Sequence, residues 1–576
     1  MIRISVLLFA VLATPLAAQG RSATNPHKSA AAPGTFWLDE GVRTFTARAT
    51  KPEITADDLR VRLYQFADDS MMGREAGTLG NWKATEYIAR EYKRLGLVPA
   101  GENGTYFQEI QYGQLRYDST KVRLVAAGRA LQLGTDWMPV IPSATLQIHG
   151  NFAGASSGVV YGGRWMDSTV TLTASMVRGK VVVFAPAGPA APRPANTPAP
   201  RDVRATEAGA AAILIVGDLS TRIAITGRSG LMPTVPGATA AASITPAAAA
   251  ALFDKPLDQL VVGAAGNAVS GGWTYEYSAP EFPARNVIGV LPGSDPVLHH
   301  QYVLIGAHND HVGMVRGAVK PEHDSLRAFN KVMRPQGAND RVSMESVTPA
   351  QWKTINDLIA GARKVRPARA DSVNNGADDD GSGTVVLLEI AERMVSQPAP
   401  KRSMIFISHT AEEKGLLGSM WWTDHPTLPR DSIVAAHNMD MLGKGRVTDV
   451  RFGGPASVQM LGSRRLSAEF GDVIDSLNAV RNEPMVIDYS WDRTNALRRF
   501  CRSDQVSYFR FAIPVTYFSL GYSADYHQPT DEPQYIDYVH GARVGRFVEE
   551  ISRTVANRTE RLKVLPVGER DLSSQC

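Results

Sequence analysis

The chain has 576 residues, of which 44% are apolar and 20% are charged, so it is long enough for two or three domains with ample core material. Its formal net charge of +4 is small for this length and gives only a weak electrostatic field. No block of about five or six basic residues occurs, which excludes nucleic acid as an expected partner.

The first residues predict a secretory signal peptide over 1–18. Arg3 supplies the positive start, residues 4–13 are nearly all apolar, and small residues precede the expected cleavage point at Ala18. The apolar run is too short to cross a bilayer, so we expect a secreted or periplasmic protein without stable membrane insertion. Residues 19–50 are rich in Ala, Thr, Ser and Pro and predict a leader without fixed structure.

The next segments predict helices followed by a smaller mixed domain. Apolar spacing indicates helices from residue 55 and over 81–95, and Gly96 follows as a stop signal. Residues 115–285 are rich in Val, Thr, Gly and Ala, and we expect them to form a domain inserted between the two parts of a larger one, 51–114 and 286–576. Within the inserted domain we expect strands over 180–185 and 212–216 and a helix over 203–211.

From residue 284 onward, strands and helices alternate. Buried strands are expected at 302–307, 404–408, 434–438 and 513–519, and helices at 384–395 and 538–562. This order predicts an α/β fold of three layers, with a mostly parallel sheet flanked by helices. The polar stretch 312–372 is an insertion into this domain and is helical over 350–363.

Histidine and acidic residues, all of them potential metal ligands, lie just after four of these strands. Ligands of open α/β sheets bind beyond the carboxyl ends of the strands, so we expect these side chains to meet in one crevice. They are His308, Asp310, Glu412, Glu413, Asp440 and His527.

Asp379 lies in a different setting, a glycine-flanked acidic turn over 376–383. Three adjacent carboxylates repel one another, and a bound cation would hold them together. The alternative is a solvated turn in which Ser382 caps the following helix.

Two histidines with several carboxylates and no cysteine suit zinc with open coordination positions. A pair of ions ~3.5–4 Å apart would need a bridging carboxylate. Glu412 and Glu413 divide the remaining work, because one ligates while the other takes a proton from water. Plainer alternatives are a core histidine at 308, a solvated helix start at 412–413, a turn at 440 and a loop histidine at 527.

These residues occur in segments that resemble peptidase family M28, the zinc metallopeptidases of the aminopeptidase type. The resemblance covers about residues 55–560. Its segments are GAHNDHVG at 306–313, GADDDGSG at 376–383, EEKGLLGS at 412–419, NMDM at 438–441 and YHQPTD at 526–531. Residues 115–285 resemble a protease-associated domain, on the strand at 180–185 and on EAGAAA at 207–212.

The resemblance implies a role for each position. Asp379 would bridge two zinc ions, with His308 and Asp440 completing one site and Glu413 and His527 the other. Glu412 would be the general base, and Asp310 would orient His308. The implied function is an exopeptidase that removes N-terminal residues from peptides.

Two departures and three alternatives remain. The link from residue 308 to 379 is longer than in many family members, and Gln505 stands where relatives often have histidine. The alternatives are a carboxypeptidase that holds a terminal carboxylate through Arg498, Arg499 or Arg502, a glutaminyl-cyclase-like acyltransferase with one zinc, and a receptor-like binding protein without activity. The complete set of ligands and base argues against the last two. The sequence leaves the oligomeric state open.

Overall fold

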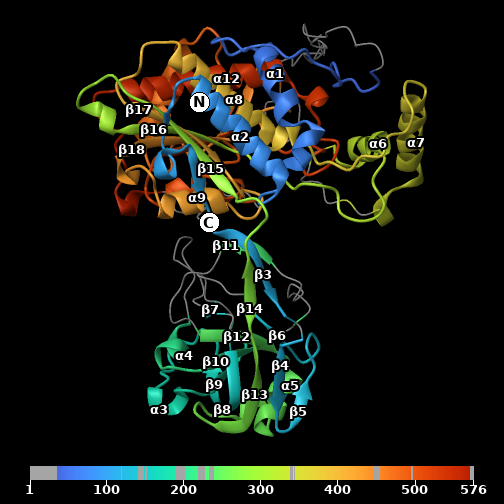
Figure 1. Ribbon diagram of the computed structural model, residues 1–576, viewed down its shortest axis with the longest axis vertical. Helices are drawn as coiled ribbons and strands as arrows, with labels where there is room; N and C mark the ends of the chain where they lie inside the picture. Colours follow the sequence, from blue (N-terminus) through green and yellow to red (C-terminus); the bar gives the residue numbers. More distant parts are fainter. Residues whose placement is uncertain are drawn as a thin grey trace, which may run out of the picture.

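The computed structural model describes most of the chain from residue 35 onward. The described residues are 35–570 apart from 119, 141–147, 150–151, 189–201, 218, 220–227, 232–238, 336, 338–341, 343, 445–453 and 494–496. They form a large body and a small body joined by a narrow ribbon of strands (Figure 1). The predicted signal peptide lies outside the described residues. Among the helices that are described, none has both the length and the apolar character to cross a bilayer.

The large body is built on a nine-stranded mixed sheet. Its four central strands are parallel and lie in the order β17 (Ser403–His409), β16 (Tyr302–His308), β18 (Ile433–Met439) and β21 (Val515–Ser519). Every residue of β17 and β18 is buried, as in a strand that is covered on both faces. The outer strands are β1 (Val98–Pro99), β2 (Phe107–Glu109), β15 (Arg285–Leu291), β19 (Ser457–Leu461) and β20 (Val486–Asp488).

Helices cover both faces of this sheet. Val303 and Ile305 of β16 enter one apolar core, and Leu304 between them enters another. The first core is closed by α1 (Ala56–Phe66), α2 (Leu79–Arg94), α8 (Gly383–Val395), α10 (Ala468–Val480) and α12 (Tyr538–Asn557). The second is closed by α9 (Leu417–Asp424) and α11 (Gln505–Phe509). The predicted α/β class is therefore confirmed, with helices on both faces of a sheet that is parallel at its centre.

The small body has its own nine-stranded sheet and two apolar cores. Its strands are β4 (Arg123–Ala126), β5 (Arg129–Leu131), β6 (Trp137–Pro139), β7 (Ile148–His149), β8 (Phe152–Arg164), β9 (Val181–Ala185), β10 (Ala212–Val216), β12 (Thr239–Ile244) and β13 (Ala265–Trp273). Its helices are α3 (Ala174–Val177), α4 (Arg204–Glu207) and α5 (Pro246–Phe253). The helix expected over 203–211 is shorter, because Gly209 has a φ of 82° and the chain turns there. The resemblance of this body to a protease-associated domain stays a prediction.

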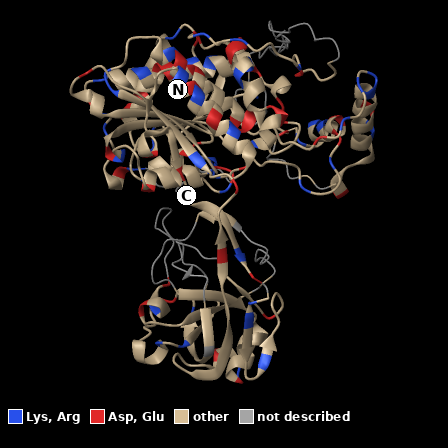
Figure 2. Cartoon of the chain, in the orientation of Figure 1, with Lys and Arg blue, Asp and Glu red and all other residues tan. Residues whose placement is uncertain are grey.

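A three-stranded ribbon joins the two bodies. It consists of β3 (Tyr112–Tyr117), β11 (Arg228–Leu231) and β14 (Tyr275–Ser278), with β3 in the middle and antiparallel to both neighbours. Figure 2 shows basic and acidic residues interspersed over both bodies, as the small net charge predicts.

The segment 312–372 carries two helices that stand at the side of the large body (Figure 1). They are α6 (His323–Met333) and α7 (Pro349–Arg363), and they pack on each other and on Phe36 and Trp37. The Trp37 indole donates to Asp324 Oδ1 at 2.9 Å. An aromatic pair thus anchors this part of residues 19–50 to the insertion, and the leader expected over 19–50 stays a prediction.

Candidate metal centre

The predicted site residues meet at the carboxyl ends of the parallel strands. His308 is the last residue of β16, and Asp440 follows β18 directly. Glu412 and Glu413 lie in the loop after β17, and His527 lies in the loop after β21. The fold thus brings four separate loops to one edge of the sheet, as expected for an open α/β domain.

The acidic turn before α8 is buried, so it is not the solvated turn of the alternative interpretation. Asp378, Asp379 and Asp380 are each at most 3% exposed. The Asp380 carboxylate accepts backbone N–H bonds from His308 at 3.0 Å and from Met441 at 3.1 Å. Asp378 accepts the N–H of the residue at 443 at 2.7 Å. The outer two carboxylates hold neighbouring loops, and the middle one faces the histidines.

One group of donor atoms comprises His308, Asp379 and Asp440. His308 Nε2 lies 3.2 Å from Asp379 Oδ1 and 3.8 Å from Asp440 Oδ1. Ser503 Oγ donates to the other oxygen of Asp440 at 2.6 Å, which fixes that carboxylate. Sequence reasoning missed Ser503, because only the fold brings its hydroxyl to Asp440, which is 63 residues away in the chain.

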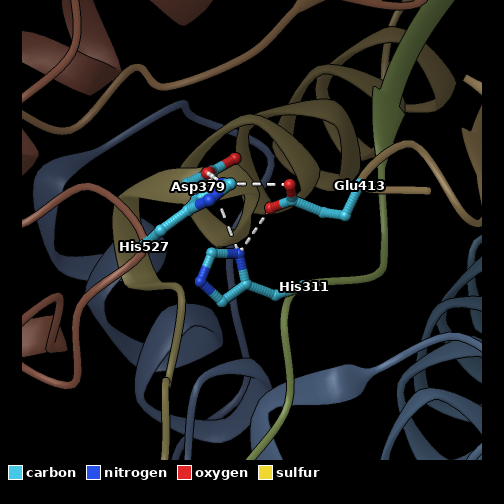
Figure 3. A group of neighbouring side chains, drawn as sticks. All are labelled: His311, Asp379, Glu413 and His527. Carbon is cyan, nitrogen blue, oxygen red and sulfur yellow. Dashed lines mark ion pairs between the residues drawn. The ribbon is translucent and has the colours of Figure 1, made fainter. Parts of the chain in front are cut away.

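The second group comprises His311, Asp379, Glu413 and His527, and its side chains point at one another (Figure 3). His527 Nε2 lies 3.1 Å from Asp379 Oδ2 and 2.9 Å from Glu413 Oε2. His311 Nδ1 lies 2.8 Å from Glu413 Oε1. Asp379 turns one oxygen to each group, which is the arrangement that a bridging carboxylate requires.

The donor atoms of both groups are suited to a cation. Side-chain atoms in this cluster are buried and have no hydrogen-bond partner among the described residues, which is costly unless a cation lies beside them. Nitrogen and oxygen donors without cysteine fit zinc. The unpaired atoms are His308 Nε2, His311 Nδ1, Asp379 Oδ2, Glu413 Oε1, Asp440 Oδ1 and His527 Nε2.

Glu412 lies beside the donor atoms but outside both groups. Its Oε2 is 4.0 Å from His308 Nε2, and the residue is 9% exposed. Its position is held by Asp310, whose carboxylate accepts the backbone N–H of Glu412 at 3.0 Å and of Glu413 at 3.4 Å. Asp310 Oδ1 also lies 3.6 Å from His308 Nδ1. Asp310 therefore connects the histidine loop with the loop of the two glutamates.

The charges of the cluster act strongly on one another. Burial lowers the pKa of His308, but the carboxylates around it, Glu412 first, outweigh burial and raise that pKa well above its usual value. Burial likewise lowers the pKa of His527, but the nearby carboxylates of Asp379 and Glu413 outweigh burial and raise that pKa to about 10. Burial also raises the pKa of Glu412 well above its usual value, although the His308 charge opposes this. The cluster thus binds protons tightly when no other cation neutralises it.

A third group of His323, Asp371 and Glu532 has a different character. The Arg369 guanidinium lies 2.6 Å from Glu532 Oε1 and 3.3 Å from Asp371 Oδ2. His323 Nε2 lies 2.8 Å from Glu532 Oε2. Because an arginine already neutralises these carboxylates, we interpret the group as an ion-pair network that fastens α6 to the loop after His527.

The arginines of the carboxypeptidase alternative have unequal surroundings. Arg499 is buried, with its guanidinium over the rings of Trp491 and Tyr522. Arg502 is exposed, and its Nη2 lies 3.4 Å from the hydroxyl of Tyr526, next to His527. A cleft of about 450 Å³ is lined in part by His527. The residues that line it include Met314, Pro321, Leu326, Lys414 and Gln528.

Comparisons with known proteins point to one family. Residues 286–552 match the model of peptidase family M28. The aminopeptidase YwaD of Bacillus subtilis is 44% identical over 81 residues, which are 13% of this chain and 17% of that protein. Leucine aminopeptidase 1 of Trichoderma harzianum is 29% identical over 179 residues, 26% of this chain and 43% of that protein. The matches thus span less than half the length of these curated relatives.

Solved structures of similar proteins cover more of the chain. The aminopeptidase from Aneurinibacillus sp. strain AM-1 covers 89% of this chain and 97% of its own, with a TM-score of 0.43 and 16% identity. The zinc aminopeptidase BSAP from Bacillus subtilis covers 91% and 98%, with a TM-score of 0.41 and 16% identity. With the family match over the sheet and the loops at its edge, residues 286–552 belong to peptidase family M28.

Proposed function

We propose that the chain is an exported zinc-dependent aminopeptidase that removes N-terminal residues from peptides. One observation carries this proposal: unpaired, buried histidine and carboxylate atoms converge in two groups that share Asp379, with Glu412 beside them and free of both. The family of residues 286–552 and the aminopeptidase names of its relatives support it.

Each group would hold one zinc ion. His308, Asp379 and Asp440 would bind one, and Asp379, Glu413 and His527 the other. When bound, the two ions would polarise the scissile carbonyl and lower the pKa of the attacking water. Asp379 would contribute one oxygen to each site, because each of its oxygens faces one group.

Glu412 is the proposed general base. As water attacks the carbonyl carbon of the first peptide bond, a Glu412 carboxylate oxygen accepts the water proton. The same carboxyl then gives the proton to the leaving nitrogen while the carbon–nitrogen bond breaks. Asp310 keeps Glu412 in place through the backbone bond at 3.0 Å, so the base does not depend on its own side-chain contacts for position.

A substrate with a free amine would need an acidic partner beside the metal centre. Glu412 lies outside both groups, so its carboxylate is free of the ions and is the group available to the ammonium of a peptide N-terminus. The cleft beside His527 offers room for the peptide.

Hydrolysis of amino-acid p-nitroanilides tests the proposal. The panel would present each residue with a free and with an acetylated amine to metal-free protein, with and without zinc. Glu412→Gln would be compared with Asp357→Asn, an exposed carboxylate on α7. We expect zinc-dependent cleavage of the free amines only, a loss of about 10²–10⁴-fold in kcat for Glu412→Gln with zinc still bound, and full activity in the control.

Other outcomes would select the alternatives. Protein with two tightly bound zinc ions that cleaves acetylated dipeptides but no p-nitroanilide would indicate the carboxypeptidase, with Arg502 as the first residue to replace. Absence of both cleavage and tight zinc binding would indicate the binding protein. Export is tested separately by sequencing the N-terminus of protein recovered outside the cytoplasm, which should begin just after Ala18.

A further inference from the structure

His311 is buried in the second donor group although the predicted ligand set leaves it out. Its side chain is 0% exposed, and its Nδ1 lies 2.8 Å from Glu413 Oε1 and 3.8 Å from Asp379 Oδ2. The ring centroid is 5.3 Å from that of His527 (Figure 3). His311 thus faces the two carboxylates that would also meet His527 at one cation.

Neither ring nitrogen of His311 has a hydrogen-bond partner in the described part of the chain. The short contact with Glu413 Oε1 also lacks hydrogen-bond geometry, since that oxygen is unpaired as well. Two buried histidines outside the donor groups differ from His311 in that each has one paired ring nitrogen. His437 Nδ1 pairs with a threonine hydroxyl at 2.7 Å, and His540 Nε2 lies 2.7 Å from a backbone carbonyl. His311 instead resembles His527, whose Nε2 is unpaired and directed at the same carboxylates.

The fold fixes the His311 ring in this orientation. The backbone N–H of His311 donates to the carbonyl of Arg74 at 3.1 Å. Arg74 is fully buried and donates to the carbonyls of Asn375 at 2.6 Å and of Gly376 at 2.8 Å. The ring packs on Gly376, where an added Cβ would lie 2.6 Å from its Cγ. The turn that carries Asp379 and the loop that carries His311 are therefore held together, with the ring pressed toward the group.

We propose that His311 Nδ1 is an additional protein ligand of the cation held by Asp379, Glu413 and His527. This inference rests on the proposed metal centre and makes its two sites unequal. The second group then offers four protein donors, whereas the first offers three. Four protein ligands are typical of tightly held zinc, and three leave an open position. The site of the second group therefore binds zinc first and releases it last. The ion held by His308, Asp379 and Asp440 is the one that exchanges more readily.

The competing explanation is that His311 only donates a hydrogen bond to Glu413 and orients it. The two explanations predict different ligand counts. At one zinc equivalent, X-ray absorption at the zinc edge should show two imidazoles per ion if His311 ligates, and one if it does not. Wild-type protein alone answers this question, so the inference does not depend on a variant that folds.

Variants supply an independent measurement. Full-length protein freed of metal would be titrated with zinc against a chromogenic chelator, for wild type, His311→Gln and His323→Gln. The control removes a histidine that is just as buried and also close to carboxylates, but in the group neutralised by Arg369. We expect His311→Gln to weaken the tighter site by more than about 100-fold, beyond the roughly 10- to 100-fold effect of losing an outer hydrogen bond. His323→Gln should leave both affinities unchanged.

Each outcome has a distinct meaning. Two imidazoles at the first zinc, with one in His311→Gln, support the proposal. One imidazole at the first zinc in wild type overturns it while leaving the proposed aminopeptidase intact. Failure of wild type to bind zinc tightly overturns the metal centre itself, and the proposed function with it.

Discussion

Asp310 shows how much of the site depends on a side chain that belongs to neither donor group. Its carboxylate contacts the His308 ring on one side and two backbone N–H groups of the glutamate loop on the other. The family resemblance implied the first contact, and the two-residue spacing is compatible with it. The contact with the glutamate loop could not be predicted, because nearly every residue type has a backbone N–H group and the sequence does not show which of them lie near Asp310.

Asp310→Asn should therefore weaken both metal affinity and catalysis. The amide has one acceptor oxygen where the carboxylate has two, so one of the three contacts is lost. We expect zinc affinity to fall about 10- to 100-fold. Competition with a chelator measures the affinity, and kcat at saturating zinc measures the effect on Glu412. Wild-type values for both would show that Asp310 has no positioning role.

The difference between the predicted and the observed cluster also arises at this scale. His308, Asp379, Glu413, Asp440 and His527 could be predicted because each lies in a segment of family type or follows a buried strand. His311 lies in the same segment as His308, but it is three positions beyond the end of the strand. The alternation of side chains along a strand therefore does not determine where its ring points. Only the turn through Gly313, with a φ of 80°, and the bonds to Arg74 decide where its ring points.

At the scale of elements, central strands were predicted well and outer ones poorly. The strands expected at 404–408 and 434–438 correspond to β17 and β18 with one more residue at each end. Their uninterrupted apolar runs reflect burial on both faces. The short strands β19 and β20 were not predicted, since an outer strand needs few apolar residues and its pairing depends on neighbours distant in sequence.

Arg74 fastens elements that meet at the metal centre. Its guanidinium donates to carbonyls at the end of α1, after β16 and before α8, which belong to Phe66, Asn309, Asn375 and Gly376. Arg74→Leu would leave these buried carbonyls unpaired, and we expect a loss of about 3–5 kcal/mol in the free energy of unfolding. Urea unfolding followed by circular dichroism measures this loss. A change below about 1 kcal/mol would mean that water replaces the guanidinium.

The stability of β18 should depend on pH through His437. Burial lowers the pKa of His437 from 6.5 to about 3. The unfolded chain therefore takes up a proton at a higher pH than the folded chain, so the stabilisation present above pH 6.5 is lost as the pH falls toward 3.

His437→Gln removes this titration and can keep a hydrogen bond to the Thr516 hydroxyl. Between about pH 7.5 and pH 5, wild type should lose about 2 kcal/mol more of its free energy of unfolding than the variant. Urea titrations at the two pH values measure the difference. Equal losses in the two proteins would contradict a buried neutral imidazole.

At the scale of the whole molecule, the small body is connected to the large one as an insertion into a hairpin. Tyr117 of β3 lies opposite Tyr275 of β14, so the points at which the chain enters and leaves the small body are paired with each other. A chain in which Asn-Gly replaces 118–274 should close this hairpin with a two-residue turn. All three donor groups lie outside the removed range.

We expect the shortened chain to fold and to bind zinc with the stoichiometry of the full chain. A small loss of stability should follow from the removal of Leu231, which packs beside Tyr112 of the ribbon. Metal analysis and thermal unfolding of the two chains provide the comparison. A shortened chain that binds no zinc would show that the small body supports the metal centre.

The discontinuity of the large body also bears on the order in which the chain folds. The small body completes its two cores within one uninterrupted stretch of sequence. Helices α1 and α2 instead share their core with α8 and α12, which lie about three hundred or more residues later. Domains generally fold as units while the chain lengthens, and contacts at long sequence separation form slowly. The small body, which begins second along the chain, is therefore the first to be completed. Helices α1 and α2 are synthesised first, but their apolar faces stay uncovered until α12 has been synthesised.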